Sequence, residues 1–115
     1  MREFAMAGDS EQIYSVTGVE VEVQKRHPPI LVVRAKGETN TSGWTGAALS
    51  QVVYVDPPQD GIQDYTFVAT PPSEGGLDVL TPVEAEDSWP DFEAWVRGVR
   101  VSAATNSIEE KIGGS

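Results

Sequence analysis

Carboxylates dominate the side chains of this sequence that could take part in chemistry. The chain holds two groups of them, first Asp56, Asp60 and Asp64, and then Glu84, Glu86, Asp87, Asp91 and Glu93. Carboxylate oxygens are the ligands that Ca²⁺ prefers, and the ion takes about six to eight of them. The D-x-D-x-D-G spacing of an EF-hand loop is absent from both groups. We therefore expect solvated acidic loops, with a calcium-dependent binding module as an alternative.

The sequence contains few groups for nucleophilic catalysis. It has no cysteine, which excludes disulfides, thiolate metal sites and cysteine nucleophiles, and it has no G-x-S-x-G motif. Its one histidine, His27, stands beside two prolines and is expected to be an exposed turn residue. Paired carboxylates are the chemistry of glycoside hydrolysis, so a small carboxylate-dependent hydrolase is a second alternative. The residue types alone leave the presence of catalysis open.

Three tryptophans offer a different chemistry, which is binding through an aromatic ring. Trp44 lies among glycines and small polar residues that cannot form an apolar strand, so we expect an exposed indole there. An exposed indole suits stacking against a sugar or a hot spot for a protein partner. Trp89 and Trp95 are expected to be buried under a loop.

The charge of the chain is unevenly distributed. The formal net charge is −10, and residues 37–96 contain 11 acidic and no basic side chains. Such a surface repels phosphates, which argues against nucleic acid as a partner. No stretch has the length and apolarity of a membrane span, and the start of the chain has no apolar signal-peptide core, so we predict no membrane partner and a cytoplasmic location. A mature or truncated extracellular domain would show the same features.

These side chains must be positioned by strands, because apolar residues alternate with polar ones along most of the chain. Strands are predicted at 19–24, 30–36, 51–56, 64–70, 77–85 and 95–104. Short strands at this spacing indicate an all-β, single-domain antiparallel sandwich of about seven strands. Ser88 with Asp91, and Ser107 with Glu110, have capping-box spacing, which predicts short helical turns near 88–94 and near the C-terminus.

The first two predicted strands fit together as a hairpin whose paired residue numbers sum to 56. This register places Val23 opposite Val33 on the core face, and Glu22 opposite Arg34 on the wet face. Charge pairs and the buried face together specify a register. Because the prolines after His27 cannot supply a left-handed turn residue, a wider loop or two strands in different sheets are alternatives.

Tyr65 and Phe67 have the spacing found at the start of a strand in the tyrosine corner. This short stretch resembles the corner of immunoglobulin-like sandwiches, a resemblance that implies a Greek-key arrangement and carries no function.

Together these patterns predict a disordered segment over 1–11, one sandwich domain over 12–112 and a flexible tail over 113–115. We expect a non-catalytic binding module whose acidic, Trp-containing loops select a cationic protein or a polyhydroxy ligand. The expected ligand-binding residues are Trp44, Asp56, Asp60, Asp64, Glu84, Glu86 and Asp87. Sandwich edges would also allow a homo-oligomer.

Overall fold

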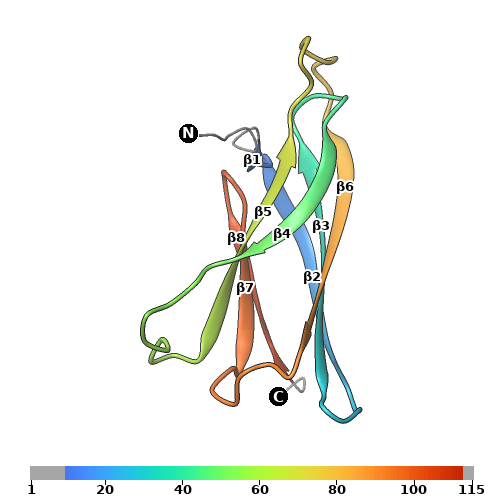
Figure 1. The fold of residues 1–115 in the computed structure, drawn as a ribbon. Helices are drawn as coiled ribbons and strands as arrows, with labels where there is room; N and C mark the ends of the chain where they lie inside the picture. Colours follow the sequence, from blue (N-terminus) through green and yellow to red (C-terminus); the bar gives the residue numbers. More distant parts are fainter. Residues whose placement is uncertain (1–9, 113–115) are drawn as a thin grey trace, which may run out of the picture.

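Two β-sheets pack face to face in the structure, which is a computed structural model that describes residues 10–112 (Figure 1). The strands are β1 (Glu11–Gln12), β2 (Ser15–Gln24), β3 (Ile30–Thr39), β4 (Thr45–Gln51), β5 (Ile62–Thr70), β6 (Thr81–Pro90), β7 (Gly98–Ser102) and β8 (Ser107–Lys111). One sheet contains β1, β4, β5, β7 and β8, and the other has the order β2-β3-β6. The predicted all-β sandwich is confirmed.

Strand β5 is the centre of the larger sheet. It pairs with β4 in antiparallel orientation and with β7 in parallel orientation. Val68 pairs with both Gln12 of β1 and Ala48 of β4, so β1 and β4 lie on opposite sides of β5. The chain reaches β7 from β5 by way of β6 in the other sheet. The sandwich is therefore mostly antiparallel, with one parallel pair at its centre.

The alternation of side chains builds the core between the sheets. Tyr65, Phe67 and Ala69 of β5 are fully buried, as are Leu31 and Val33 of β3. Successive residues of a strand point to opposite faces, so the odd-numbered positions of both strands share the core. The period-two pattern thus predicted the core face of β3 correctly.

The first hairpin is confirmed, but its predicted register is wrong by two residues. Val21 lies opposite Val33, and the paired numbers along this part of β2 and β3 sum to 54. The predicted register would leave only three residues, two of them prolines, in the loop. The observed loop of residues 25–29 gives those prolines more room. A shift of two residues keeps every side chain on its predicted face.

The predicted helical turn near 88–94 is wrong. Strand β6 continues to Pro90 because β3 offers it an unbroken partner, with Leu31 opposite Trp89 and Val32 opposite Ser88. The residues near Ser107 form β8 instead of a second helical turn. A ladder of backbone hydrogen bonds outweighs a single capping pattern in both places.

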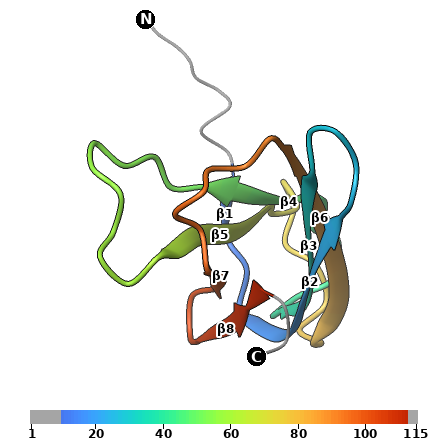
Figure 2. The same cartoon turned by 90° about the horizontal axis from the view of Figure 1, so that it is seen from below.

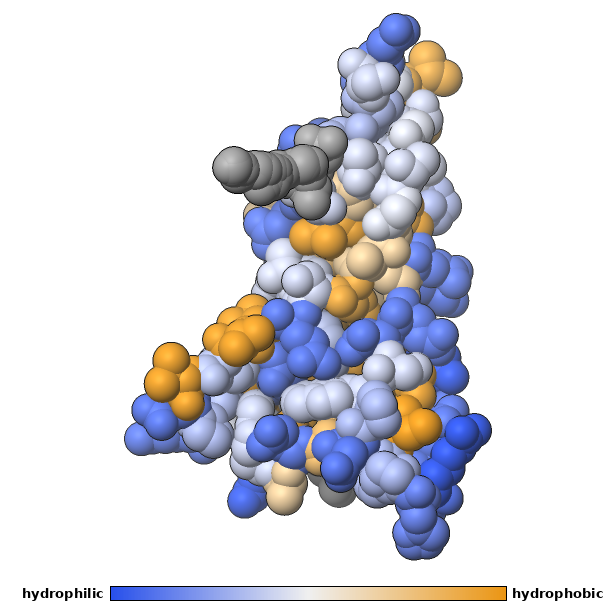
Figure 3. Space-filling view, in the orientation of Figure 1, coloured by the Kyte–Doolittle hydropathy of each residue, from blue (hydrophilic) through white to orange (hydrophobic). Residues whose placement is uncertain are grey.

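The predicted strand at 51–56 is wrong, because the strand in this part of the chain is β4, which reaches only the first residue of that range. Strand β4 ends at Gln51, and Val53 and Val55 belong to the loop that follows, with exposed fractions of 90% and 100%. That loop stands out from the sandwich when the molecule is seen from below (Figure 2). Orange apolar atoms mark the same projecting region in the space-filling view (Figure 3).

The described range limits two of the domain predictions. Residues 1–9 and 113–115 lie outside it, and so do most of the predicted N-terminal segment and the predicted C-terminal tail. Glu11, at the end of the predicted N-terminal segment, lies in β1 and pairs with Ala69 of β5. Among residues 10–112 there is no helix of the length and apolarity needed to cross a membrane.

Two glycines in paired strands provide a test of the packing. A Cβ atom on Gly37 would lie 2.5 Å from both the carbonyl oxygen of Ser15 and Cδ1 of Ile13, whereas one on Gly18 would meet nothing within 4 Å. We expect Gly37→Ala to lower the free energy of unfolding by about 1–3 kcal/mol through overpacking. Gly18→Ala is the matched control and should be neutral or stabilising, because it reduces the entropy of the unfolded chain. Urea denaturation of both variants measures the difference, and equal effects would contradict this packing.

Candidate functional site

A concavity of about 290 Å³ lies where the loop after β4 faces the segment after β6. Its lining comes from those two segments and from one residue each of β4, β5 and β6: Gln51, Val52, Val53, Tyr54, Val55, Pro57, Gln63, Trp89, Glu93 and Trp95. Three of these residues are aromatic, three are polar, and none is Lys or Arg. The site is therefore an aromatic hollow with hydrogen-bonding side chains, which is the usual composition of a small-ligand site.

The aromatic rings are held against one another. Tyr54 and Trp95 meet edge to face, with ring centroids 6.1 Å apart and an interplanar angle of 77°. Trp89 packs against Phe92 at a centroid distance of 6.3 Å. Tyr54, Trp89 and Trp95 are half-buried, and all three contribute to the lining. Rings fixed in this way lose little further side-chain entropy when a ligand binds.

Tyr54 is anchored to β5 through its hydroxyl group. The hydroxyl donates to Oδ2 of Asp64 at 2.7 Å and accepts from the backbone N–H of Asp64 at 2.9 Å. Burial, followed by the hydrogen bond to the Asp64 carboxylate, raises the pKa of Tyr54 above its ordinary value. Tyr54 therefore remains a neutral donor, and its ring stays at the edge of the concavity.

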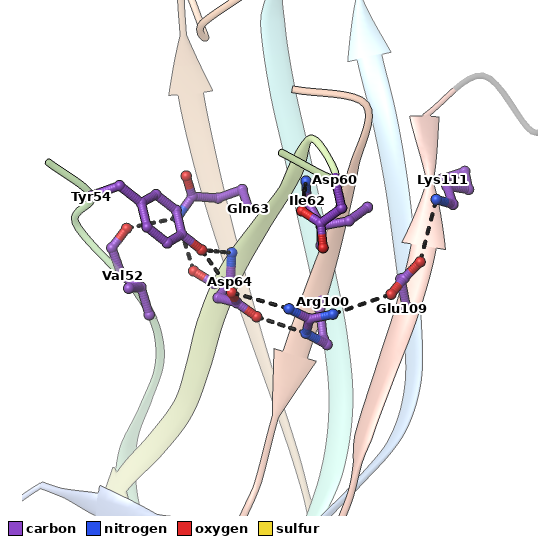
Figure 4. Close-up of polar contacts among 9 residues, drawn as sticks. All are labelled: Val52, Tyr54, Asp60, Ile62, Gln63, Asp64, Arg100, Glu109 and Lys111. Carbon is purple, nitrogen blue, oxygen red and sulfur yellow. Dashed lines mark hydrogen bonds and ion pairs between the residues drawn. The ribbon is translucent and has the colours of Figure 1, made fainter. Parts of the chain in front are cut away.

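Asp64 is the acidic residue that joins the loop to the sheet (Figure 4). Arg100 of β7 donates to its two carboxylate oxygens at 2.7 and 3.2 Å, and also donates to Glu109 of β8 at 3.3 Å. Lys111 extends this row with an ion pair to Glu109 at 3.3 Å. Burial by itself would raise the pKa of Asp64, but the hydrogen bonds from Arg100 and Tyr54 outweigh it and lower that pKa. Asp64 is thus an ionised structural acceptor.

Two glutamines of the lining point their donors into the protein. Nε2 of Gln63 donates to the carbonyl oxygens of Val52 and Asp64 at 2.8 and 2.9 Å. Nε2 of Gln51 lies 3.2 Å from the Asp87 carboxylate and 3.3 Å from the hydroxyl of Tyr65. Carbonyl and carboxylate partners require a donor, so these contacts fix which end of each amide is nitrogen.

The amide oxygens of the same glutamines are left for other partners. Among residues 10–112, no hydrogen bond reaches Oε1 of Gln63 or Oε1 of Gln51. The Gln63 side chain is only 2% exposed, and its oxygen points away from the Asp64–Arg100 pair (Figure 4). A buried acceptor without a protein donor needs one from water or from a ligand. Gln63 therefore brings an open acceptor to the concavity.

The hydroxyl of Tyr65 differs from that of a tyrosine corner. It donates to Oδ2 of Asp87 in β6 at 3.2 Å and so links the two sheets through side chains. Burial, with the charge of Asp87 next in importance, raises the pKa of Tyr65 well above its ordinary range. The Tyr65 hydroxyl also accepts from Nε2 of Gln51. In a tyrosine corner this hydroxyl would instead donate to the backbone a few residues upstream.

The first predicted carboxylate group does not form a joint site for a ligand. Asp56 is exposed in the loop between β4 and β5. Asp60 accepts the N–H of Ile62 at 3.0 Å, which is an Asx-type turn that leads into β5. Asp64 is committed to Arg100 and Tyr54. Only Asp64 is connected to the concavity, and it acts there by holding Tyr54.

The second predicted group is divided: Asp91 and Glu93 follow β6, and the other three members lie on two faces of that strand. Glu84 and Glu86 are exposed on the outer face, where Glu86 accepts from Arg34 at 2.8 Å. Arg34 also binds Glu22 at 3.1 Å, so this predicted ion pair forms even though the two residues are not directly opposite in the ladder. Asp87 faces the interior and is half-buried beside Gln51. Within residues 10–112, no three His, Asp or Glu side chains gather in a way that could hold a metal ion.

Trp44 lies at the far end of β4 from the concavity. Its ring is half-buried and packs against the core, and its Nε1 donates to Oγ1 of Thr41 at 2.9 Å. The two tryptophans expected under a loop, Trp89 and Trp95, are the ones that line the hollow. Their spacing around a Pro-containing turn was a signal for an aromatic site, but nothing in the sequence places Tyr54 or Gln63 next to them.

The ion pair of Asp64 predicts a pH-dependent contribution to stability. We expect Asp64→Asn to lower the free energy of unfolding at pH 7 by about 1.5–3 kcal/mol, because charge-assisted hydrogen bonds to Arg100 are weakened. A carboxyl whose pKa is lowered in the folded state stabilises the fold above its unfolded pKa, and this contribution is lost as the pH falls through the folded value. The gap between wild type and variant should therefore begin to close as the pH falls below the ordinary pKa of about 3.8, and it should vanish only below the lowered pKa of the folded state.

Urea denaturation across pH 2–8 measures that gap, with the exposed Asp78→Asn as the control for loss of a surface charge. A gap that does not change with pH would contradict the assignment of Asp64 as an ionised acceptor.

The described residues thus place half-buried aromatic rings in one hollow, together with two glutamines whose amide N–H groups already donate to the protein and whose amide oxygens accept no hydrogen bond from it. No protein-family model, no curated protein and no solved structure matches the chain.

Proposed function

We propose that this domain is a non-catalytic binding module that takes its ligand in the concavity between the loop after β4 and the segment after β6. The observation that carries the proposal is the open acceptor of Gln63 at the base of an aromatic hollow. Aromatic rings supply contact area, while a few placed polar groups set the orientation of a bound molecule. The sandwich beneath supplies a rigid frame for both.

The arrangement of carboxylates favours binding over hydrolysis. A glycosidase needs two carboxyl groups that flank one bond, about 5–9.5 Å apart, and one of them must be able to donate a proton. The lining contains one carboxylate, Glu93. Asp64 stands behind Tyr54, and its lowered pKa keeps it ionised and unable to act as a general acid.

The ligand is expected to donate hydrogen bonds. The side-chain acceptors that remain open on the lining are the amide oxygens of Gln51 and Gln63 and the carboxylate of Glu93. A cationic segment of a protein and a polyhydroxy compound both satisfy such acceptors, and an anion does not. This supports the two ligand classes that the charge and tryptophan content of the chain suggested.

A fragment panel tests this proposal by NMR. We expect cationic or polyhydroxy fragments to shift the indole N–H signals of Trp89 and Trp95, and carboxylate fragments to leave them unchanged. Trp95→Leu should weaken the responsive fragments by at least about tenfold, since it removes one wall of the hollow.

Trp44→Leu is the matched control, because it removes another half-buried indole at the opposite end of β4. Circular dichroism verifies that both variants are folded. Shifts that cluster around Trp44, or anionic fragments that bind best, would overturn the proposal.

A further inference from the structure

We infer that the group bound in the concavity is an organic cation, that is, an alkylammonium or guanidinium group. This inference rests on the proposed function and narrows it to one ligand chemistry. It depends on three features of the hollow: the partner that its buried acceptor lacks, the identity of its walls, and the charge around it.

The first feature is the acceptor of Gln63. Both Nε2 hydrogens are used by the carbonyl oxygens of Val52 and Asp64, so the amide cannot turn to offer a donor without losing two hydrogen bonds. Its Oε1 therefore presents fixed negative partial charge on a residue that is only 2% exposed. Acceptors in such surroundings interact more strongly with a charged donor than with a neutral one.

The second feature is the aromatic lining. A cation near the face of Trp or Tyr is attracted by the negative face of the ring, and Trp is the strongest partner. Two tryptophans and Tyr54 line the hollow, and the Tyr54 hydroxyl already donates to a carboxylate. A volume of about 290 Å³ lies at the lower end of small-ligand sites, about 300–1,000 Å³, so it suits one headgroup more than an extended ligand.

The third feature is the local charge. No Lys or Arg lines the concavity, and Glu93 adds a carboxylate to it. Arg100, the cation that contacts Asp64 behind Tyr54, is also committed to Glu109. The lining residues all belong to the 37–96 segment, which carries 11 acidic and no basic side chains. A field of one sign concentrates ligands of the opposite sign around such a site.

Paired probes of equal shape separate charge from size. Choline is compared with its neutral analogue 3,3-dimethylbutan-1-ol, and Nα-acetyl-lysine methylamide with the norleucine equivalent; methyl β-glucopyranoside represents polyhydroxy ligands. Binding is measured on the full chain by the NMR shifts of the Trp89 and Trp95 indole groups. We expect each cation to bind at least about fivefold more tightly than its neutral analogue, with affinity falling as salt is added.

Two variants with the same change of charge locate the effect. Glu93→Gln should weaken choline binding by about threefold or more, because it removes the carboxylate of the lining. Glu84→Gln removes a carboxylate from the outer face of β6 and should leave the affinity within about a factor of 1.5. Equal losses in both variants would show a general charge effect and contradict a cation site in the hollow.

The outcomes separate this inference from the proposed function. If the neutral analogues or the glucoside shift the same indole signals as strongly as the cations, the cation inference is wrong and the proposed binding site stands. If none of the five probes shifts these signals, the cation inference is wrong, and the fragment panel decides the proposed function. A response to lysine but not choline would assign the site to a side chain of a protein partner.

Discussion

The carboxylate of Asp64 is the contact on which the geometry of the concavity depends. It joins the loop after β4, through Tyr54, to β5 and then to Arg100 on β7. A half-buried charge is stable only when its oxygens are paired, and here three donor groups satisfy it. The loop that carries exposed Val53 and Val55 is thereby attached to a rigid sheet, and the wall of the concavity formed by Tyr54 keeps its position.

The fold could be predicted from the sequence to the level of strands and faces. Alternating apolar residues identified much of β2 and β3, and a strand was correctly predicted at 64–70, within β5. The register of the first hairpin could not be predicted from its charge pairs. The long side chain of Arg34 reaches Glu22 although the residue directly opposite it is Glu20, so the same ion pair forms in more than one register. Nor could a short capping pattern reveal that β3 would extend β6 to Pro90, because that pairing joins residues far apart in the chain.

The candidate site was predictable only in its chemistry. Acidic and aromatic side chains were expected to form a site, but the lining contains Glu93, Trp89 and Trp95 and none of the predicted binding residues. Strand alternation also sends Glu86 outward and Asp87 inward, so neighbours in sequence are separated in space. The sequence could not identify Gln63 as a site residue, since its role depends on which backbone groups accept the hydrogen bonds of its amide N–H groups. Tertiary structure brings those backbone carbonyls together, so the role of Gln63 cannot be predicted from its residue type.

The most direct measurement of the central claim, that this hollow takes an organic cation, is a set of nuclear Overhauser effects in the choline complex. The N-methyl protons of bound choline should show contacts with ring protons of Tyr54, Trp89 and Trp95, because these rings line the concavity. Contacts with Trp44, or contacts confined to residues outside the lining while choline is bound, would contradict it.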